Sequence, residues 1–108
     1  MAITTTTSPE TQDVTEHRLE KLYHVIILND DEHTFEYVIE MLHSVFGLSE
    51  TTAMAHAIEA DTTGSSIVAT LRLEEAERKK DQIHAYGPDW RLPHSRNSVA
   101  AIVEPAAS

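Results

Sequence analysis

The sequence predicts a small two-layer α+β domain with the element order βααβαβ, in which a three-stranded sheet carries three helices on one face. Two observations predict this class. Short apolar runs rich in β-branched residues have the length of buried strands, and they cover residues 23–28, 66–71 and 98–103. Longer segments with apolar or small residues at helical spacing lie between them, over residues 34–46, 50–60 and 73–86. Such elements pack as two layers around one core.

The first strand and the first helix have the clearest patterns. Tyr23–Leu28 is a continuous apolar run, and from Phe35 onward the apolar spacing changes to that of a helix. The apolar face of this helix is formed by Phe35, Val38, Ile39, Leu42, Val45 and Phe46. We expect His33 or Thr34 to cap the helix at its start, and Gly47 suits the position just after its end.

The second half of the chain repeats this alternation of helices and strands. Ser49 suits the N-cap of a helix over Glu50–Ala60, and Asp61–Gly64 is predicted to be a turn. The third helix, Leu73–Tyr86, is expected to carry pairs of opposite charge four residues apart; these are Glu74–Arg78 and Glu75–Lys79. The segment 87–97 contains two prolines and predicts a loop, in which Trp90 either is exposed or covers the open side of the sheet.

The length of 108 residues allows one domain. Residues 1–22 are rich in Thr, Ser and Glu, and predict a flexible tail because they offer little apolar surface to bury. We expect the folded domain to span residues 23–105 and residues 106–108 to be a frayed end. A hydrophobic content of 41% suffices for a small core.

The net charge of −10 argues against nucleic acid as a partner, because that binding requires basic side chains. Negative charge favours cationic partners, or simply keeps a small protein in solution. No apolar run approaches the roughly 20 residues that span a membrane, and the N-terminus has no signal-peptide pattern. We therefore expect a cytoplasmic protein that does not bind membranes and is monomeric when free.

Catalysis and metal binding have weak support in this sequence. The chain has no cysteine, no glycine-rich phosphate loop and no Gly-x-Ser-x-Gly motif. Asp30 and Asp31 are adjacent carboxylates, but neighbours in a turn usually point apart. The seven histidines are spread along the chain, and His33 with Glu36 near Asp30 does not form a recognised ligand spacing. We expect no enzyme activity, no cofactor and no metal site.

The acidic segment Asn29–Glu32 is the main candidate for a binding site. It places carboxylate and amide oxygens between an apolar strand and an apolar helix face, which suits a ligand with a positive charge beside a hydrophobic group. A purely structural role is the alternative, because Asn and Asp favour turns and acids are stabilised near a helix N-terminus.

This stretch resembles ClpS, the adaptor family of the Clp protease. The resemblance begins with a strand, Asn-Asp-Asp and an amphipathic helix, and Gly64 precedes a second strand in both. Glu74–Lys79 is similar to the family's Glu-x-Ala-Glu-x-Lys helix start, and Val103-Glu104-Pro105 resembles its Leu-Glu-Pro ending. The resemblance covers Tyr23–Pro105 and implies the same βααβαβ fold.

The resemblance implies a non-catalytic adaptor for N-degrons, proteins recognised by a bulky hydrophobic N-terminal residue. The adaptor would deliver them to the N-terminal domain of a Clp AAA+ ATPase, ClpA- or ClpC-like, for proteolysis. Residues matching the amine-binding positions are Asn29, Asp30 and Asp31. Residues matching the hydrophobic pocket are Phe35, Val38, Ala57, Ala60 and Val99, and those matching the ATPase-docking positions are Glu74 and Lys79.

Two departures from the family bear on the site. Asp61 stands where the family has a histidine that helps to bind the amine; a carboxylate can accept from an ammonium group, or Asp61 can be a turn residue only. Ala57 and Ala60 are smaller than the usual aliphatic residues. We therefore expect a wider cavity that prefers Phe, Tyr or Trp to Leu, unless Phe35 fills it.

Two other functions stay open. A divergent ClpS-like regulator would dock on the Clp ATPase without binding N-degrons. A stand-alone interaction domain of the same fold would bind an unrelated ligand at its acidic site.

Overall fold

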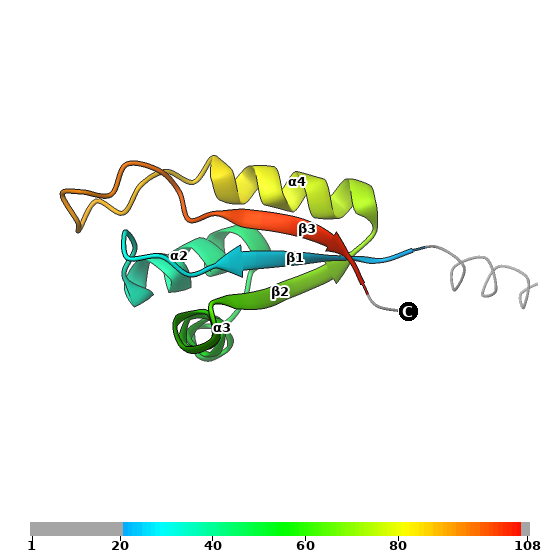
Figure 1. Cartoon of the computed structure of the whole chain (residues 1–108), viewed down its shortest axis with the longest axis horizontal. Helices are drawn as coiled ribbons and strands as arrows, with labels where there is room; N and C mark the ends of the chain where they lie inside the picture. The colour runs from blue at the N-terminus through cyan, green and yellow to red at the C-terminus, as the bar shows by residue number, and fades with distance from the viewer. Residues whose placement is uncertain (1–20, 107–108) are drawn as a thin grey trace, which may run out of the picture.

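The computed structural model describes residues 21–106, and its elements follow the predicted order β1, α2, α3, β2, α4, β3 (Figure 1). The strands are β1 (Tyr23–Leu28), β2 (Ser65–Leu71) and β3 (Ala101–Pro105). The helices are α2 (Phe35–Phe46), α3 (Glu50–Thr63) and α4 (Leu73–His84). The predicted α+β class is therefore confirmed. Most of the predicted tail and the last two residues lie outside the described part.

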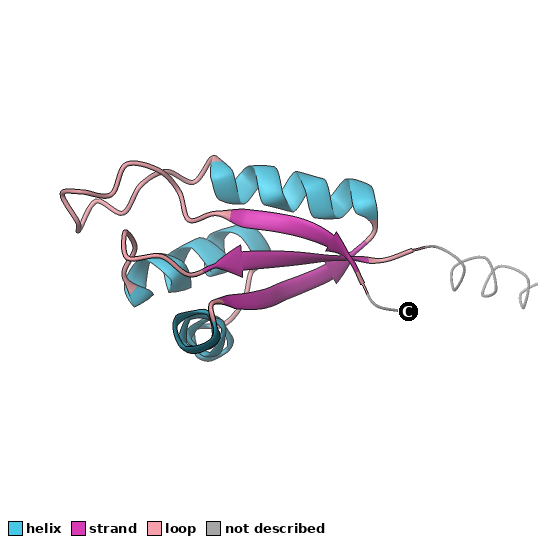
Figure 2. Cartoon of the chain, in the orientation of Figure 1, coloured by secondary structure: helices cyan, strands magenta, loops and turns pink. Residues whose placement is uncertain are grey.

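The three strands form one antiparallel sheet in the order β2-β1-β3. Tyr23 pairs with Leu71 and Pro105, so the start of β1 lies beside the connection from β2 to α4. At the other end, Leu28 pairs with Ser65. The segments that follow β1 and α4 extend from this second end of the sheet (Figures 1 and 2).

The core gathers one face of the sheet and residues from all three helices. Val25 and Ile27 alternate along β1 with side chains of the opposite face, as expected for a strand that is buried on one side. Helix α2 contributes Tyr37, Val38, Met41 and Leu42, while α3 contributes three alanines and α4 contributes Ala76 and Ile83. Small residues let α3 approach the core closely. The predicted apolar face of α2 is correct for the buried Val38 and Leu42 but wrong for Phe35, which is exposed, and the buried Tyr37 and Met41 lie outside that face.

Helix α3 runs further than predicted, so the expected turn at 61–64 is wrong for its first three residues. The hydroxyls of Thr62 and Thr63 donate to backbone carbonyls of the preceding turn, so both side chains have partners within the helix. The helix ends at Gly64, whose φ of 100° is readily adopted only by glycine and whose N–H donates to the Ala60 carbonyl.

The other boundaries also shift for identifiable reasons. Helix α4 ends at His84 rather than at Tyr86. Strand β3 begins at Ala101 rather than at Ser98, because the Ser98 hydroxyl bonds to the loop after α4 and the Val99 N–H donates to the Tyr37 hydroxyl. Of the two predicted caps for α2, Thr34 is confirmed, since its hydroxyl accepts from the Tyr37 N–H at 3.1 Å.

The charged pairs on α4 have a different spacing from the predicted one. Arg78 pairs with Glu75, and Lys80 pairs with Glu77 at 2.9 Å, so both pairs are three residues apart. Among the described helices, none is long and apolar enough to cross a membrane.

Candidate functional site

A small cavity lies at the end of β1. Its volume is about 40 Å³, and its lining comprises Ile27, Leu28, Asn29, Asp30, His33, Phe35, Val38, Ala57, Ala60, Asp61 and Val99. The tertiary structure therefore brings together all five predicted pocket residues and three of the four predicted amine-binding residues. They come from the turn after β1, from α2 and α3, and from the segment before β3.

Backbone hydrogen bonds explain why these distant segments meet. The Asn29 N–H donates to the Gly64 carbonyl at 2.9 Å, which ties the end of β1 to the end of α3. The Leu28 N–H donates to the Ala100 carbonyl at 3.0 Å, which ties it to the segment before β3. Asp61 and Val99 consequently lie next to the acidic turn.

The apolar wall is buried, with one exception. Val38, Ala57, Ala60 and Val99 are buried, whereas Phe35 is 40% exposed. A dry cavity that holds benzene measures about 150 Å³, so a cavity of about 40 Å³ cannot hold an aromatic ring. The wider cavity expected from the two alanines is absent while Phe35 lines the space.

The acidic rim contains two carboxylates with different surroundings. Asp30 accepts from the Glu32 N–H at 2.9 Å, and its two oxygens lie 2.8 and 2.9 Å from Nδ1 of His33. Asp61 is exposed, and its carboxylate has no hydrogen-bond or ion-pair partner among residues 21–106. Asp61 also stands in the last turn of α3, where the helix dipole disfavours an anion by about 0.3–1 kcal/mol. Asp61 is therefore the more available acceptor for a cation.

Asp31 does not line the cavity, unlike the other three predicted amine-binding residues. It is exposed, and its backbone carbonyl lies 3.0 Å from Nε2 of His94 in the loop after α4. Adjacent residues in the turn therefore point apart.

Three lining residues were not predicted from the sequence. Ile27 and Leu28 were assigned to the strand alone, although their position just before Asn29 points to the cavity. The sequence indicates His33 as a helix cap or, weakly, as a metal ligand, and not as a lining residue. Its spacing of three residues from Asp30 was the available signal for the contact that the structure has. Its side chain is only 3% exposed.

The loop after α4 is fixed to the start of α2 by a buried carboxylate. Asp89 is 1% exposed and accepts from the N–H and the hydroxyl of Thr34, at 2.7 and 2.8 Å. It also accepts from the Arg91 N–H at 3.0 Å and from the Arg91 guanidinium group. Burial alone would raise the pKa of Asp89, but these hydrogen bonds outweigh it and lower the pKa to about 2. The neighbouring Trp90 is 81% exposed, so it does not cover the sheet.

The predicted docking residues lie on α4 and do not line the cavity. Glu74 is exposed in the first turn of α4, close to the start of β1. Lys79 donates from Nζ to the Val45 carbonyl at 2.8 Å and lies 5.5 Å from the centre of the Phe46 ring. At about 3.4 Å per residue, the six residues of β1 separate its two ends by roughly 17 Å. Glu74 and the cavity therefore lie on separate surfaces.

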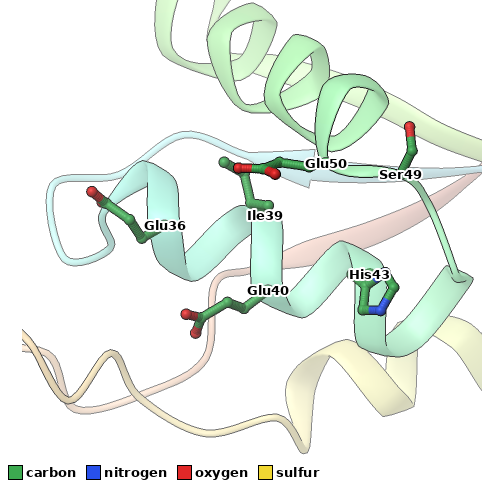
Figure 3. Close-up of a pocket in the computed structure, with 6 residues that line it drawn as sticks. All are labelled: Glu36, Ile39, Glu40, His43, Ser49 and Glu50. Atoms are coloured by element: carbon green, nitrogen blue, oxygen red, sulfur yellow. The ribbon is translucent and has the colours of Figure 1, made fainter.

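A larger depression of about 410 Å³ lies on another face of α2 (Figure 3). Its lining residues are Glu36, Ile39, Glu40, His43, Ser49 and Glu50. Glu40 pairs with Arg91 at 2.5 Å, and Nδ1 of His43 lies 3.0 Å from the Leu48 carbonyl. None of the predicted site residues lines it.

Comparison with known proteins agrees with this architecture. The family described as "ATP-dependent Clp protease adaptor protein ClpS" matches residues 18–91. The ClpS adapter of Nautilia profundicola is 41% identical over 64 residues, which are 59% of this chain and 66% of that protein. The ClpS adapter of Synechococcus sp. is 34% identical over 88 residues, which are 81% of this chain and 94% of that protein.

A solved structure is similar over nearly its whole length. It is that of Agrobacterium tumefaciens ClpS2 bound to L-phenylalaninamide, with a TM-score of 0.69 and 31% sequence identity. The match covers 80% of this chain and 98% of that one. The family match, the relatives and this fold together lead to one conclusion: the chain belongs to the ClpS family of Clp protease adaptors.

Proposed function

We propose that this adaptor captures proteins by a free N-terminal amine next to a bulky hydrophobic side chain, and presents them to the N-terminal domain of a ClpA- or ClpC-like ATPase. The observation that carries the proposal is the composition of the cavity at the end of β1. Acceptor groups of Asn29, Asp30 and Asp61 line it together with apolar side chains. Unfolding and proteolysis would be carried out by the partner, and the adaptor itself would have no catalytic residue.

The chemistry of an N-terminal residue matches this lining. Its ammonium group has a positive charge and three donors, and therefore requires oxygens such as those of Asn29 and Asp61. Its side chain requires a dry apolar wall, which Val38, Ala57 and Val99 provide. L-phenylalaninamide, the ligand in the ClpS2 structure, combines a free amine with a benzyl group. The unpaired Asp61 carboxylate, unfavourable at a helix C-terminus, would be stabilised by such a cation.

The size of the cavity requires Phe35 to move. Because the space is about 40 Å³, a large side chain can enter only if the Phe35 ring turns outward. Phe35 is already 40% exposed and begins α2, so its displacement would expose little further apolar surface. We therefore propose that Phe35 gates the pocket.

The separation of the two candidate surfaces supports an adaptor role. Glu74 and Lys79 would contact the ATPase from α4, while the substrate would occupy the opposite end of the sheet. The hydrogen bond from Lys79 to Val45 fixes its stem against α2, which limits the entropy lost on docking. Opposite charges at these positions would set the orientation of the complex.

Fluorescence anisotropy tests the proposal directly. Labelled peptides beginning with Phe, Tyr, Trp, Leu or Ala would be titrated, each with a free and with an acetylated N-terminus. We expect binding of free aromatic termini that is lost on acetylation and reduced about tenfold or more by Asp61→Asn, since a hydrogen bond to a charged group contributes about 1.5–3 kcal/mol. Asp81→Asn, an exposed carboxylate on α4, is the matched control.

The small cavity favours one second candidate, a regulator that docks on the ATPase without binding N-degrons. Measuring peptide binding and ATPase binding on the same variants distinguishes the two functions. If no peptide binds, yet an isolated ATPase N-domain binds the wild type and not the Glu74→Ala or Lys79→Ala variant, the regulator is the correct function. If peptides bind as described, it is excluded.

A further inference from the structure

We infer that His33 is a positioning residue: as an imidazolium it bridges the acidic turn and the loop after α4, and thereby couples ligand capture to its own protonation. The inference rests on the proposed function, since it concerns the same cavity. It names a residue of this chain that the sequence patterns had not assigned to amine binding.

The contacts of the His33 ring identify its charged form as the one that fits. Nδ1 lies 2.8 and 2.9 Å from the two carboxylate oxygens of Asp30, and Nε2 lies 2.6 Å from the backbone carbonyl oxygen of Asn97. A carboxylate and a carbonyl both only accept hydrogen bonds. Two donors on the ring satisfy both partners, and only the imidazolium has two.

A neutral ring would leave one of these contacts unfavourable. Its single N–H could serve either Asp30 or Asn97, while the lone pair of the other nitrogen would face an oxygen at less than 3 Å. Because the ring is 3% exposed, water has little access to relieve that contact. Deprotonation would therefore release either the acidic turn or the loop.

The bridge spans the cavity wall, which explains its relevance to binding. Asp30 and His33 both line the cavity, and Asn97 lies two residues before Val99, another lining residue. The ring also packs on Tyr37 of α2, with ring centres 4.4 Å apart. Loss of the bridge would therefore leave Asp30 and the loop segment near Val99 without their common support.

The pH dependence that comes from His33 has to be distinguished from that of the other ionisable groups near the ring. They are Asp30 in the turn, Tyr37 on α2, and Asp61 across the cavity on α3. His94 contacts the far side of the same turn, but by one ring nitrogen to one carbonyl. A free peptide α-amine titrates at about 7.7–8.0. Between about pH 5.5 and 7 the ligand amine stays largely charged, so a change of affinity over this range does not come from titration of the ligand.

The test is the pH profile of affinity for a free-amine Phe peptide, in wild type, His33→Gln and the control His94→Gln. We expect wild type and His94→Gln to lose affinity by about fivefold from about pH 5.5 to 7, the ratio for one lost hydrogen bond. His33→Gln should bind more weakly at pH 5.5 with a flat profile. Equal slopes in wild type and His33→Gln, or a wild-type affinity that is constant or rises with pH, would overturn the inference.

A second measurement does not depend on ligand binding. The ¹⁵N NMR signals of the ring in the free protein report whether each nitrogen carries a proton. We expect both His33 nitrogens to be protonated at pH 5.5, with Asn97 and Glu32 amide signals that shift as the ring titrates and do not shift in His33→Gln. A single protonated nitrogen there would overturn the bridge. Absence of peptide binding at every pH would instead overturn the proposed function, with the NMR result still deciding the bridge.

Discussion

Replacing Asp89 by Asn tests whether a buried carboxylate holds the loop against α2. The negative charge accepts four hydrogen bonds from Thr34 and Arg91, whereas an amide would turn a donor toward one of those donors. The pKa lies at about 2 instead of 3.8, which corresponds to about 2 kcal/mol at neutral pH. Solvent around the surface loop screens part of this, so we expect a loss of about 1–2 kcal/mol.

The sign of the pH dependence follows from the lowered pKa. The stabilisation is present above the unfolded-chain value of 3.8 and is lost as the pH falls through about 2. Urea unfolding of wild type and Asp89→Asn should therefore differ by about 1–2 kcal/mol at pH 7 and converge near pH 2, and at neutral pH the melting temperatures should differ by about 4–16 °C. The control Asp31→Asn, at an exposed carboxylate of the neighbouring turn, should leave both the free energy of unfolding and the melting temperature unchanged. An equal difference at pH 7 and pH 2 would refute the reasoning.

Three further perturbations address the gate, the docking face and the core. Phe35→Ala should enlarge the cavity and strengthen binding of free aromatic termini several-fold, at a stability cost of about 1 kcal/mol or less; unchanged anisotropy titrations would show that Phe35 is not a gate. Lys79→Ala should cost about 1 kcal/mol in urea unfolding through its lost bond to Val45 and should also weaken ATPase N-domain binding, whereas Lys79→Arg should retain both. Burial raises the pKa of the Tyr37 hydroxyl, so the stability that this group contributes is present below the unfolded-chain value of 10.0 and lost as the pH rises through the folded value. Tyr37→Phe should cost about 1–3 kcal/mol at pH 7, because it removes the bond to the Gly87 carbonyl and leaves the Val99 N–H without its acceptor. It should also flatten the alkaline loss of stability in denaturation curves.

The sequence alone determined the class of the fold, part of the core and much of the candidate site, but it did not identify the buried Tyr37 and Met41. The run Tyr23–Leu28 and the spacing from Phe35 to Phe46 are local patterns, and burial of one face follows from them. Val38, Ala57, Ala60 and Val99 could be named in advance because the order of motifs matched one family. The predicted end of the second helix is wrong, because helix and turn preferences are nearly balanced at Thr62 and Thr63. Both residues stay helical as far as the glycine that ends α3.

The tertiary structure alone decided which groups act on one another across the cavity. His33 and Asn97 are 64 residues apart, and Thr34 and Asp89 are 55 residues apart. No local pattern relates such positions, because their contact depends on how β1 docks against the end of α3 and on where the loop returns. The width of the pocket was undecidable for the same reason: two alanines predict an open cavity, and the position of one Phe35 ring closes it. Hydrophobic spacing is a property of neighbours in the chain, whereas the pairing of buried polar groups is a property of the packed molecule.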